Sequence, residues 1–324
     1  MAKGIKLYKS ENNLITETCL EEVTKDTTFD DKTWIDLSEP TQEVLEKISK
    51  ETSIPLHFLI CSLDEEETAR IDYEDESTLI VLDVPCINKD TDEIYTKPFI
   101  ITYNNKFYVT ISRFNDTLIN TLLNKTRNIE PHKKIRLTLN LIYQLSKEFI
   151  YYLKKIDMHT KDVENRLQNS MKNREIFELM DLNKTLVYFS TALNADKAVL
   201  NKLLKSTQYK KYEEDFDLME DTEVELNQAI EMCSIYRNIL AGMMDTFASV
   251  ISNNLNIVMK TLTVITIVIS IPTLVSSIYG MNFDKIPLSK HEYGFWIILA
   301  FAFVLAIIGA IILMILTSNK NRRK

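Results

Sequence analysis

The 324-residue sequence has few of the residues from which catalytic, zinc or disulfide sites are usually built. Its four cysteines include no CxxC pair, so reduced thiols are expected, and its four histidines show no zinc-like spacing. His57 and Cys61 stand four residues apart, but two ligands do not make a site, and packing is the simpler interpretation. The acid-rich run at 63–67 has no nucleophile or histidine partner nearby, and no Walker A motif is present. These absences argue against an enzyme.

Proline and glycine are absent from residue 132 up to Gly242, and the N-terminus lacks the apolar core of a signal peptide. Within the long stretch, Leu, Ile, Tyr and Met recur at three- and four-residue intervals, which predicts long helices. Upstream, the pattern predicts a helix at 40–52, a buried strand at 79–84 and a hairpin at 101–112. We therefore expect an α+β domain over 1–130, followed by a stalk of long helices over 131–260.

Positive charge is scarce in the body of the chain. Residues 1–260 hold 32 Lys and Arg against 44 Asp and Glu, a formal charge of −12. Such an acidic body argues against nucleic acid as a partner and favours cations. From Lys260 onward charged residues nearly vanish until Lys320, and two apolar stretches replace the mixed pattern. That change is typical of membrane-spanning helices.

The two apolar stretches differ in character. Phe295–Leu316 is apolar on every side and spans roughly 33 Å as a helix. Such a helix can face lipid all round, with Trp296 at one interface. Leu262–Ile278 is shorter and carries several hydroxyls. We place transmembrane helices at 261–279 and 295–316, with an outer loop at 280–294. The basic tail at 317–324 predicts a cytoplasmic C-terminus, and the hairpin then places the N-terminal domain in the cytoplasm too.

The first of these helices carries a polar seam, which we define by residues spaced alternately four and three apart. Its members are Asp245, Ser249, Ser252, Asn256, Met259, Thr263, Thr266, Ser270, Thr273 and Ser277. A period of 3.5 places these side chains along one side of a long helix. In one interpretation the hydroxyls bond back to their own helix or hold neighbouring helices; in the other they line a water-filled pore enclosed by a ring of subunits. Pro272 can kink this helix and free a carbonyl toward the lumen or a neighbour.

The motif YGMNF at 279–283 follows this helix, and NxxMKxLT at 256–263 lies within it. Together with two terminal spans and a basic C-terminus, these motifs resemble the CorA magnesium transporter family. The segment TWIDLSEPT at 33–41 resembles an early segment of the same family. The resemblance implies a homopentamer with a funnel-shaped cytosolic domain, in the plasma (inner) membrane of a prokaryote, with the first membrane helix of each subunit lining the pore.

The resemblance also implies roles for individual residues. By this resemblance the selectivity filter comprises Gly280, Met281 and Asn282, with the Asn282 side chains holding hydrated Mg²⁺ at the outer mouth. It places pore-lining or gate positions at Asp245, Asn256, Met259, Leu262 and Thr273. The seam adds Thr263, Thr266, Ser270 and Ser277 to the pore-lining set. Two departures are that Lys285–Ser289 replace an acidic outer segment, and that Ser270 replaces a second pore methionine.

A regulatory Mg²⁺ site is a further expectation. The family joins an acid on the long helix, matched here by Asp221, to an acid pair that falls at Leu59 and Ile60 in this sequence. Asp64 or Glu65 would have to substitute for that pair. The long-helix acid is therefore matched, whereas its partners are displaced along the chain.

The expected function is passive transport of Mg²⁺, with Co²⁺ and Ni²⁺ as further candidate ions, down the electrochemical gradient and gated by cytosolic Mg²⁺. One alternative is a proton-coupled Zn²⁺ transporter of the ZntB type; those relatives tend to vary the middle residue of the motif, so Met281 favours magnesium. The other alternative is a non-conducting membrane-anchored scaffold. The continuous polar seam counts against a scaffold.

Overall fold

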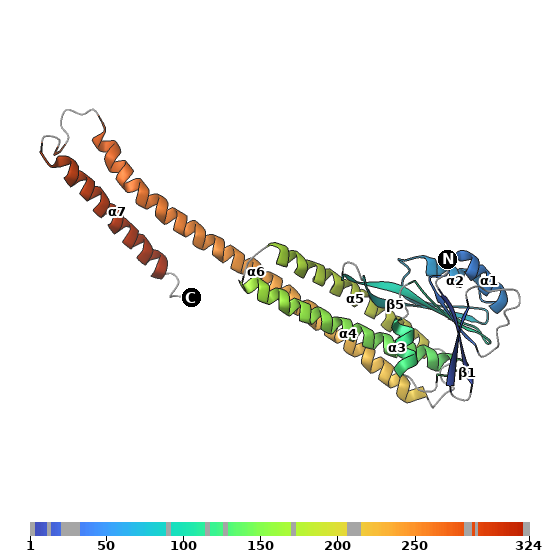
Figure 1. The fold of residues 1–324 in the computed structure, drawn as a ribbon. Coiled ribbons are helices and arrows are strands. Elements are labelled where there is room, and N and C mark those ends of the chain that lie inside the picture. Colours follow the sequence, from blue (N-terminus) through green and yellow to red (C-terminus); the bar gives the residue numbers. More distant parts are fainter. Residues whose placement is uncertain are drawn as a thin grey trace. The chain divides into compact units, whose positions relative to one another are not determined.

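The computed structural model describes residues 4–11, 14–20, 33–88, 92–113, 117–125, 129–169, 173–205, 215–281, 287–288 and 291–319. The chain divides into two compact units, Met1–Gly242 and Met243–Lys324. The first unit contains a β-sheet with helices on it, and the second contains the apolar helical segments (Figure 1). One helix, α6 (Phe216–Tyr279), begins in the first unit and continues through the second.

The described part of the first unit contains a seven-stranded sheet in the order β2-β1-β3-β7-β6-β5-β4. Only β3 and β7 pair in parallel; the other neighbours are antiparallel. The strands are β1 (Gly4–Glu11), β2 (Leu14–Leu20), β3 (Trp34–Ser38), β4 (Arg70–Glu74), β5 (Ser77–Ile87), β6 (Ile94–Tyr103) and β7 (Tyr108–Ser112). The strand predicted at 79–84 lies within β5.

The predicted hairpin at 101–112 is formed by β6 and β7, which pair from Phe99 opposite Ser112 to Tyr103 opposite Tyr108. Its turn depends on Asn104, whose Oδ1 accepts the backbone N–H groups of Lys106 and Phe107, both at 2.9 Å. An Asn side chain that captures backbone donors in this way favours a turn over a continued strand.

One face of the sheet is covered by α1 (Gln42–Thr52), α2 (Leu56–Ile60) and the short 3₁₀ helix η1 (Cys61–Leu63). Leu45, Ile48, Phe58 and Leu59 are buried there in one cluster with strand residues. Helix α1 confirms the prediction at 40–52 and ends where Ser53 adopts a left-handed conformation. Since Leu59 is fully buried in this core, an acid at that position would have to lose its hydration.

The opposite face carries the long helices predicted from the absence of proline and glycine. They are α4 (Lys134–Asn169) and α5 (Asn173–Lys205), preceded by the shorter α3 (Thr117–Lys125). Helix α5 contacts β4, β5 and β6, and it packs on α4 through Phe149 and Phe189. These two rings are fully buried, with centroids 5.0 Å apart in an edge-to-face arrangement. Such pairs add to the stability gained from apolar burial.

Within the first unit, α6 presents a buried stripe to its neighbours that comprises Thr222, Leu226, Ala229, Cys233 and Leu240. The Cys233 thiol donates a hydrogen bond to the carbonyl oxygen of Leu186 on α5, at 3.3 Å. Helix α6 is thus joined to α5 by packing and by this contact. The last helix of the second unit is α7 (Gly294–Asn319).

The segment that resembles the family's early motif is part of the core. Trp34 on β3 is fully buried, and its indole N–H donates to Thr110 Oγ1 at 2.8 Å. That hydroxyl in turn donates to Asp36 Oδ1 at 2.7 Å. Because β3 and β7 are parallel neighbours, this chain of hydrogen bonds fixes their register. The motif therefore has a structural role.

Candidate ion pathway

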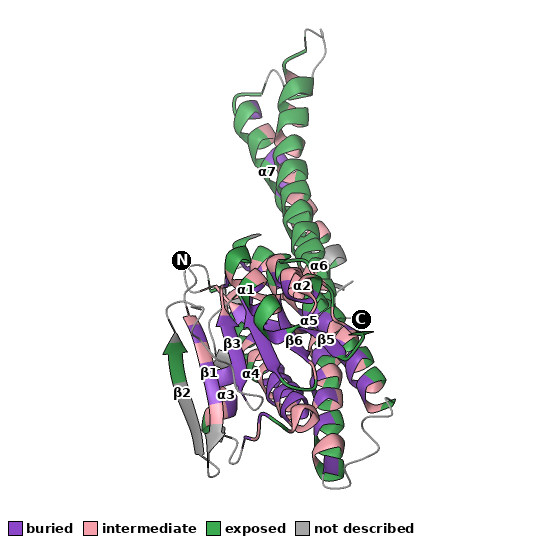
Figure 2. Cartoon of the chain, turned by 90° about the vertical axis from the view of Figure 1, so that its right-hand side faces the viewer, coloured by how far each residue is buried: buried purple, intermediate pink, exposed green. Residues whose placement is uncertain are grey.

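The polar seam lies on α6, and every one of its ten residues is exposed in the single chain. Leu262, the other residue expected to line the pore, is also exposed. Figure 2 shows the predominantly exposed surface of the apolar helices, in contrast to the buried sheet. The seam is therefore not covered by any described part of its own chain.

The opposite face of α6 packs on α7 within the second unit. The half-buried residues of α6 between residues 262 and 279 are Val264, Val268, Ile271, Pro272, Val275 and Tyr279. At about 100° of rotation per residue, the centre of this set lies roughly 180° from the centre of the seam. Helix α7 thus covers one side of α6 and leaves the seam open on the other.

Small residues on α7 make this packing close. Ala302 and Ala306 are buried, and a Cβ built at Gly309 would lie 2.9 Å from Ile271 Cδ1. Ala302, Ala306 and Gly309 follow one another at intervals of four and three residues. Small side chains along one side of a helix in this way let two membrane helices approach each other closely. The second membrane helix could face lipid all round by its hydropathy, but its small residues pack against α6, so one side of it is turned toward that helix.

Four of the seam hydroxyls bond to their own helix. Those of Thr263, Thr266, Ser270 and Thr273 each donate to the carbonyl four residues earlier, at 2.7–3.0 Å. This is one of the two arrangements expected from the sequence, and it satisfies the hydroxyl protons. The hydroxyl oxygens keep lone pairs that can accept from water. A seam of this kind is compatible with a surface in contact with water. It lies on the side of α6 away from α7.

Pro272 lies within α6 without ending it, and its side chain is half-buried. Because proline has no N–H, the carbonyl of Val268 loses its usual partner. Both residues belong to the side of α6 that α7 covers. The freed carbonyl is therefore on the side away from the seam, which agrees with the second of the two expected directions, toward a neighbouring helix, and not with the first, toward the lumen.

The GMN motif is only partly described, since Asn282 lies outside the described residues. Helix α6 ends just before it, and Gly280 N–H still donates to the Ser276 carbonyl at 2.9 Å. Met281 is about half exposed, at 49%. A Cβ at Gly280 would have only ordinary contacts, at 3.4 Å or more. The single chain therefore does not itself require glycine at this position.

Gly294, which belongs to none of the sequence motifs above, is sterically required. A Cβ there would lie 2.2 Å from the carbonyl oxygen of Leu288, and the Gly294 N–H donates to the His291 carbonyl at 2.9 Å. This close approach positions the start of α7 after the outer loop. Its sequence signal is a lone glycine directly before an apolar run.

The candidate regulatory residues are exposed in the single chain: Asp221 on α6, and Asp64 and Glu65 after η1. Glu65 is engaged by Lys97, with Arg113 at 3.9 Å, and the bond from Lys97 lowers the pKa of this carboxyl. Asp64 Oδ1 accepts the Glu66 N–H at 2.9 Å. Across the described ranges, no three His, Cys, Asp or Glu side chains converge to hold a metal ion.

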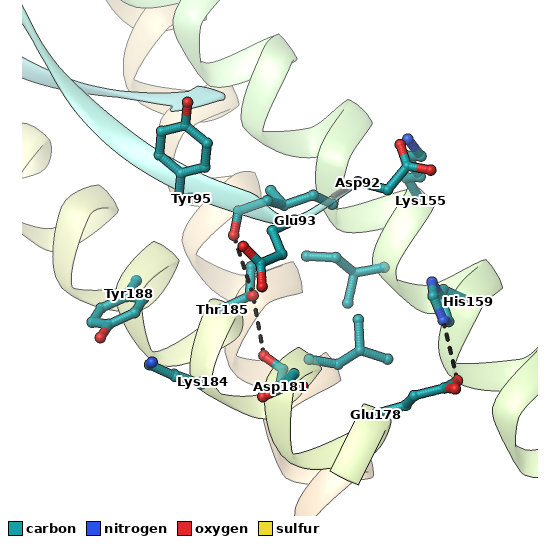
Figure 3. Close-up of a pocket in the computed structure, with 13 residues that line it drawn as sticks. Asp92, Glu93, Tyr95, Lys155, His159, Glu178, Asp181, Lys184, Thr185 and Tyr188 are labelled. Atoms are coloured by element: carbon teal, nitrogen blue, oxygen red, sulfur yellow. Dashed lines mark hydrogen bonds and ion pairs between the residues drawn. The ribbon is translucent and has the colours of Figure 1, made fainter. Parts of the chain in front are cut away.

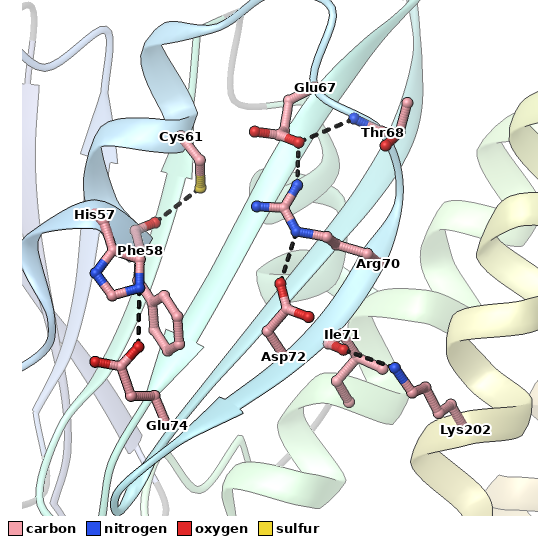
Figure 4. A network of polar contacts seen from close by, with 10 residues as sticks. All are labelled: His57, Phe58, Cys61, Glu67, Thr68, Arg70, Ile71, Asp72, Glu74 and Lys202. Carbon is pink, nitrogen blue, oxygen red and sulfur yellow. Dashed lines mark hydrogen bonds and ion pairs between the residues drawn. The ribbon is translucent and has the colours of Figure 1, made fainter.

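His57 and Cys61 serve packing and hydrogen bonding (Figure 4). His57 Nε2 lies 3.0 Å from a carboxylate oxygen of Glu74, and the Cys61 thiol donates to the Phe58 carbonyl at 2.9 Å. Burial raises the pKa of Cys61 to about 12, so the sulfur remains a protonated thiol near neutral pH. The two residues do not present a metal-binding pair.

A cavity of about 540 Å³ lies between the start of β6 and helices α4 and α5 (Figure 3). Thr185 lines the cavity, and its hydroxyl lies within hydrogen-bond distance of the carbonyl oxygens of Ile94 on β6 and Asp181 on α5. Glu178 on its rim is held by Arg166 and Arg174, with His159 at 3.9 Å. Its acidic and basic residues are interspersed, which gives no single ligand charge to match.

An α+β domain, a long helix that continues into an apolar unit, and a second apolar helix define a two-span membrane protein. Both α6 and α7 are long and apolar enough to cross a membrane. The family model for CorA-like Mg²⁺ transporter proteins matches residues 30–322. The chain therefore belongs to this family.

Individual relatives agree with that assignment. The chain is 31% identical to the cobalt/magnesium transport protein CorA of Methanocaldococcus jannaschii over 85% of this chain and 87% of the relative. The complete structure of the CorA magnesium transporter from that organism matches with a TM-score of 0.81 and 27% identity, covering 95% and 96% of the two chains. The cytoplasmic domain of ZntB from Vibrio parahaemolyticus matches at 0.60 and 12% identity, over 79% and 99%, which shows the fold alone.

Proposed function

We propose that the protein is a channel subunit that conducts Mg²⁺, and Co²⁺ as a second ion, passively across the plasma membrane. The observation that carries this proposal is the position of the polar seam on α6, on the side that α7 leaves uncovered. In hydrocarbon such a seam needs water or other polar helices beside it. The cargo is inferred from the CorA-like family and its cobalt/magnesium relative.

A single α6 cannot enclose a pore, so the seam implies a ring of identical subunits. We propose a homopentamer with both termini in the cytoplasm and the loop at 280–294 outside. Gly280, Met281 and Asn282 form the selectivity filter. Magnesium gives up its waters reluctantly, and neutral amide oxygens can therefore hold its hydration shell without stripping it.

The membrane potential suffices to drive this transport. One elementary charge gains about 2.3 kcal/mol per 100 mV, so a divalent cation gains about 4.6 kcal/mol when it enters at about −100 mV. Neither ATP nor a coupling ion is required. In this proposal the protein acts as a gated path and has no enzymatic activity.

Gating by cytosolic Mg²⁺ is the finer part of the proposal. Residues 1–260 carry a formal charge of −12 in each subunit, so neighbouring domains repel one another when no cation is bound. Asp221 and Asp64 are both exposed, and two subunits could present them to one ion. Glu65 is the weaker candidate because Lys97 already neutralises it.

The test is cation flux into liposomes that contain the full-length protein. Flux of Mg²⁺ that persists after the proton gradient is collapsed supports the channel, whereas proton-dependent Zn²⁺ flux would favour the ZntB-type alternative. Asn282→Ala is expected to abolish Mg²⁺ flux while leaving assembly intact. The matched control is Asn253→Ala, the same change at an exposed position of α6 outside the seam. Absence of divalent flux from the assembled wild type would favour a scaffold.

A further inference from the structure

A buried acid joins helix α5 to an open edge of the sheet. Strand β5 pairs with β4 only as far as Val81, which lies opposite Arg70. Two residues further along, the backbone N–H of Asp83 would have pointed toward β4 had that strand continued. It donates instead to Asp196 Oδ1 on α5, at 3.0 Å.

The two carboxyl groups differ in their surroundings. Asp196 is fully buried, and its second oxygen, Oδ2, has no hydrogen-bond partner. Burial raises the pKa of Asp196 well above its ordinary value, and the nearby charge of Asp83 raises it further, although the Asp83 N–H acts in the opposite direction. Burial also raises the pKa of Asp83 itself, to about 6.

The charged side chains on the elements around Asp196 form ion pairs with, or influence, groups other than Asp196. Arg70 on β4 pairs with Glu67 and with Asp72 of its own strand, and Lys97 on β6 pairs with Glu65. Glu148 on α4 raises the pKa of Cys86, and no described cation acts on Asp196. The charged side chain that affects the pKa of Asp196 is therefore that of Asp83.

We propose that Asp83 and Asp196 form a proton-binding site that holds α5 against the edge of the sheet. While a proton is bound, one oxygen of Asp196 accepts the Asp83 N–H and no net charge is buried at that carboxyl. Loss of the proton leaves a buried carboxylate with a single hydrogen bond, beside a second carboxylate. Both effects destabilise the contact.

The direction of the pH dependence follows from the raised pKa values. A carboxyl that binds its proton more tightly in the folded state than in the unfolded state stabilises the fold at low pH. That stabilisation is lost as pH rises through the folded-state pKa. The contact should therefore be strongest in acid and should weaken as pH rises from the ordinary pKa of an aspartate, about 4. The loss contributed by Asp83 is complete once the pH has passed its raised pKa of about 6, whereas the loss contributed by Asp196 continues to higher pH.

The site is connected by contacts to the helix that carries the seam. Asp196 lies on α5, and the carbonyl of Leu186 on the same helix accepts the Cys233 thiol of α6. A shift of α5 would therefore act directly on α6. Cytosolic pH would then affect transport through this contact, independently of any bound metal ion.

The test measures the unfolding temperature of the full-length protein from about pH 5.5 to about pH 8.5. Asp196→Asn keeps an oxygen to accept the Asp83 N–H and removes the charge, so its decline in unfolding temperature at high pH should be smaller than that of wild type by about 2 °C or more. The matched control is Asp181→Asn, an exposed acid on the same helix, which should follow wild type.

Two further measurements keep the proposal open to refutation. Asp83→Asn removes the neighbouring charge and should move the pH-dependent step to lower pH. Amide exchange at residue 83 should stay slow in Asp196→Asn and become fast in Asp196→Ala. Wild-type pH dependence in Asp196→Asn, or an unmoved step in Asp83→Asn, would overturn the proposal. Because stability and amide exchange do not require transport, failure of the channel assignment would leave this test valid.

Discussion

Replacement of Gly294 by alanine should disrupt the start of α7. The new Cβ would lie 2.2 Å from the Leu288 carbonyl oxygen, whereas Cβ contacts essentially never fall below 3.0 Å. The obstructing atom belongs to the backbone, and Leu288 already has a positive φ of 64°. Forcing a methyl group into such a site costs about 3 kcal/mol, the upper end of the usual range for overpacking, unless the loop moves. Either outcome should disturb the loop that carries the GMN motif.

The assay compares Mg²⁺ uptake and unfolding temperature with those of Gly242→Ala. Among the described residues, no atom outside the neighbouring turns of its own helix lies within 4 Å of a Cβ built at Gly242, which is inside α6. In a helix interior this change should stabilise by up to about 1 kcal/mol. We expect Gly294→Ala to lose uptake and Gly242→Ala to remain at least as stable as wild type. Equal behaviour of the two variants would contradict the steric argument.

Three other predictions concern packing and thiol chemistry. Phe189→Ala should destabilise the first unit by about 3–5 kcal/mol in denaturant unfolding, because its buried ring packs on Phe149. Ala306→Leu should separate α7 from α6 and lower the thermal stability, since Ala306 is buried between them; an unchanged unfolding temperature would contradict this packing. At pH 7 to 8 a thiol reagent counted by mass spectrometry should label the exposed Cys19 first, since burial raises the pKa of three other thiols to about 11 or 12, those of Cys61, Cys86 and Cys233.

The long helices and the turn at Asn104 were predictable because their causes are local. Missing helix breakers, a regular apolar period and an Asn that caps backbone donors can each be recognised within a short window of sequence. The sheet order was not predictable in this way. The parallel pairing of β3 with β7 joins distant segments, and nothing in either local sequence indicates which strand it pairs with. Long-range pairing of this kind depends on tertiary packing.

The candidate pathway also combines a feature with a local cause and one that depends on distant residues. The seam is a local pattern of α6, whereas the side that α7 covers depends on a second helix. Ala302, Ala306 and Gly309 stand at intervals of four and three in the sequence, so side-chain size could have revealed that contact where hydropathy did not. The bond from Asp83 to Asp196 spans 113 positions, and neither residue belongs to a recognisable motif.

The most direct test of the central claim is the accessibility of single cysteines on α6 in a background with Cys19→Ser. Cysteines replacing Thr266, Ser270 or Thr273 should react with small water-soluble thiol reagents and block Mg²⁺ flux, because a wet lumen supports the thiolate. Cysteines at Ile267, Ile269 or Val275, on other sides of the helix, should react slowly and leave flux unchanged. Equal labelling of both sets, or labelling of the seam without block, would contradict an ion path along the seam.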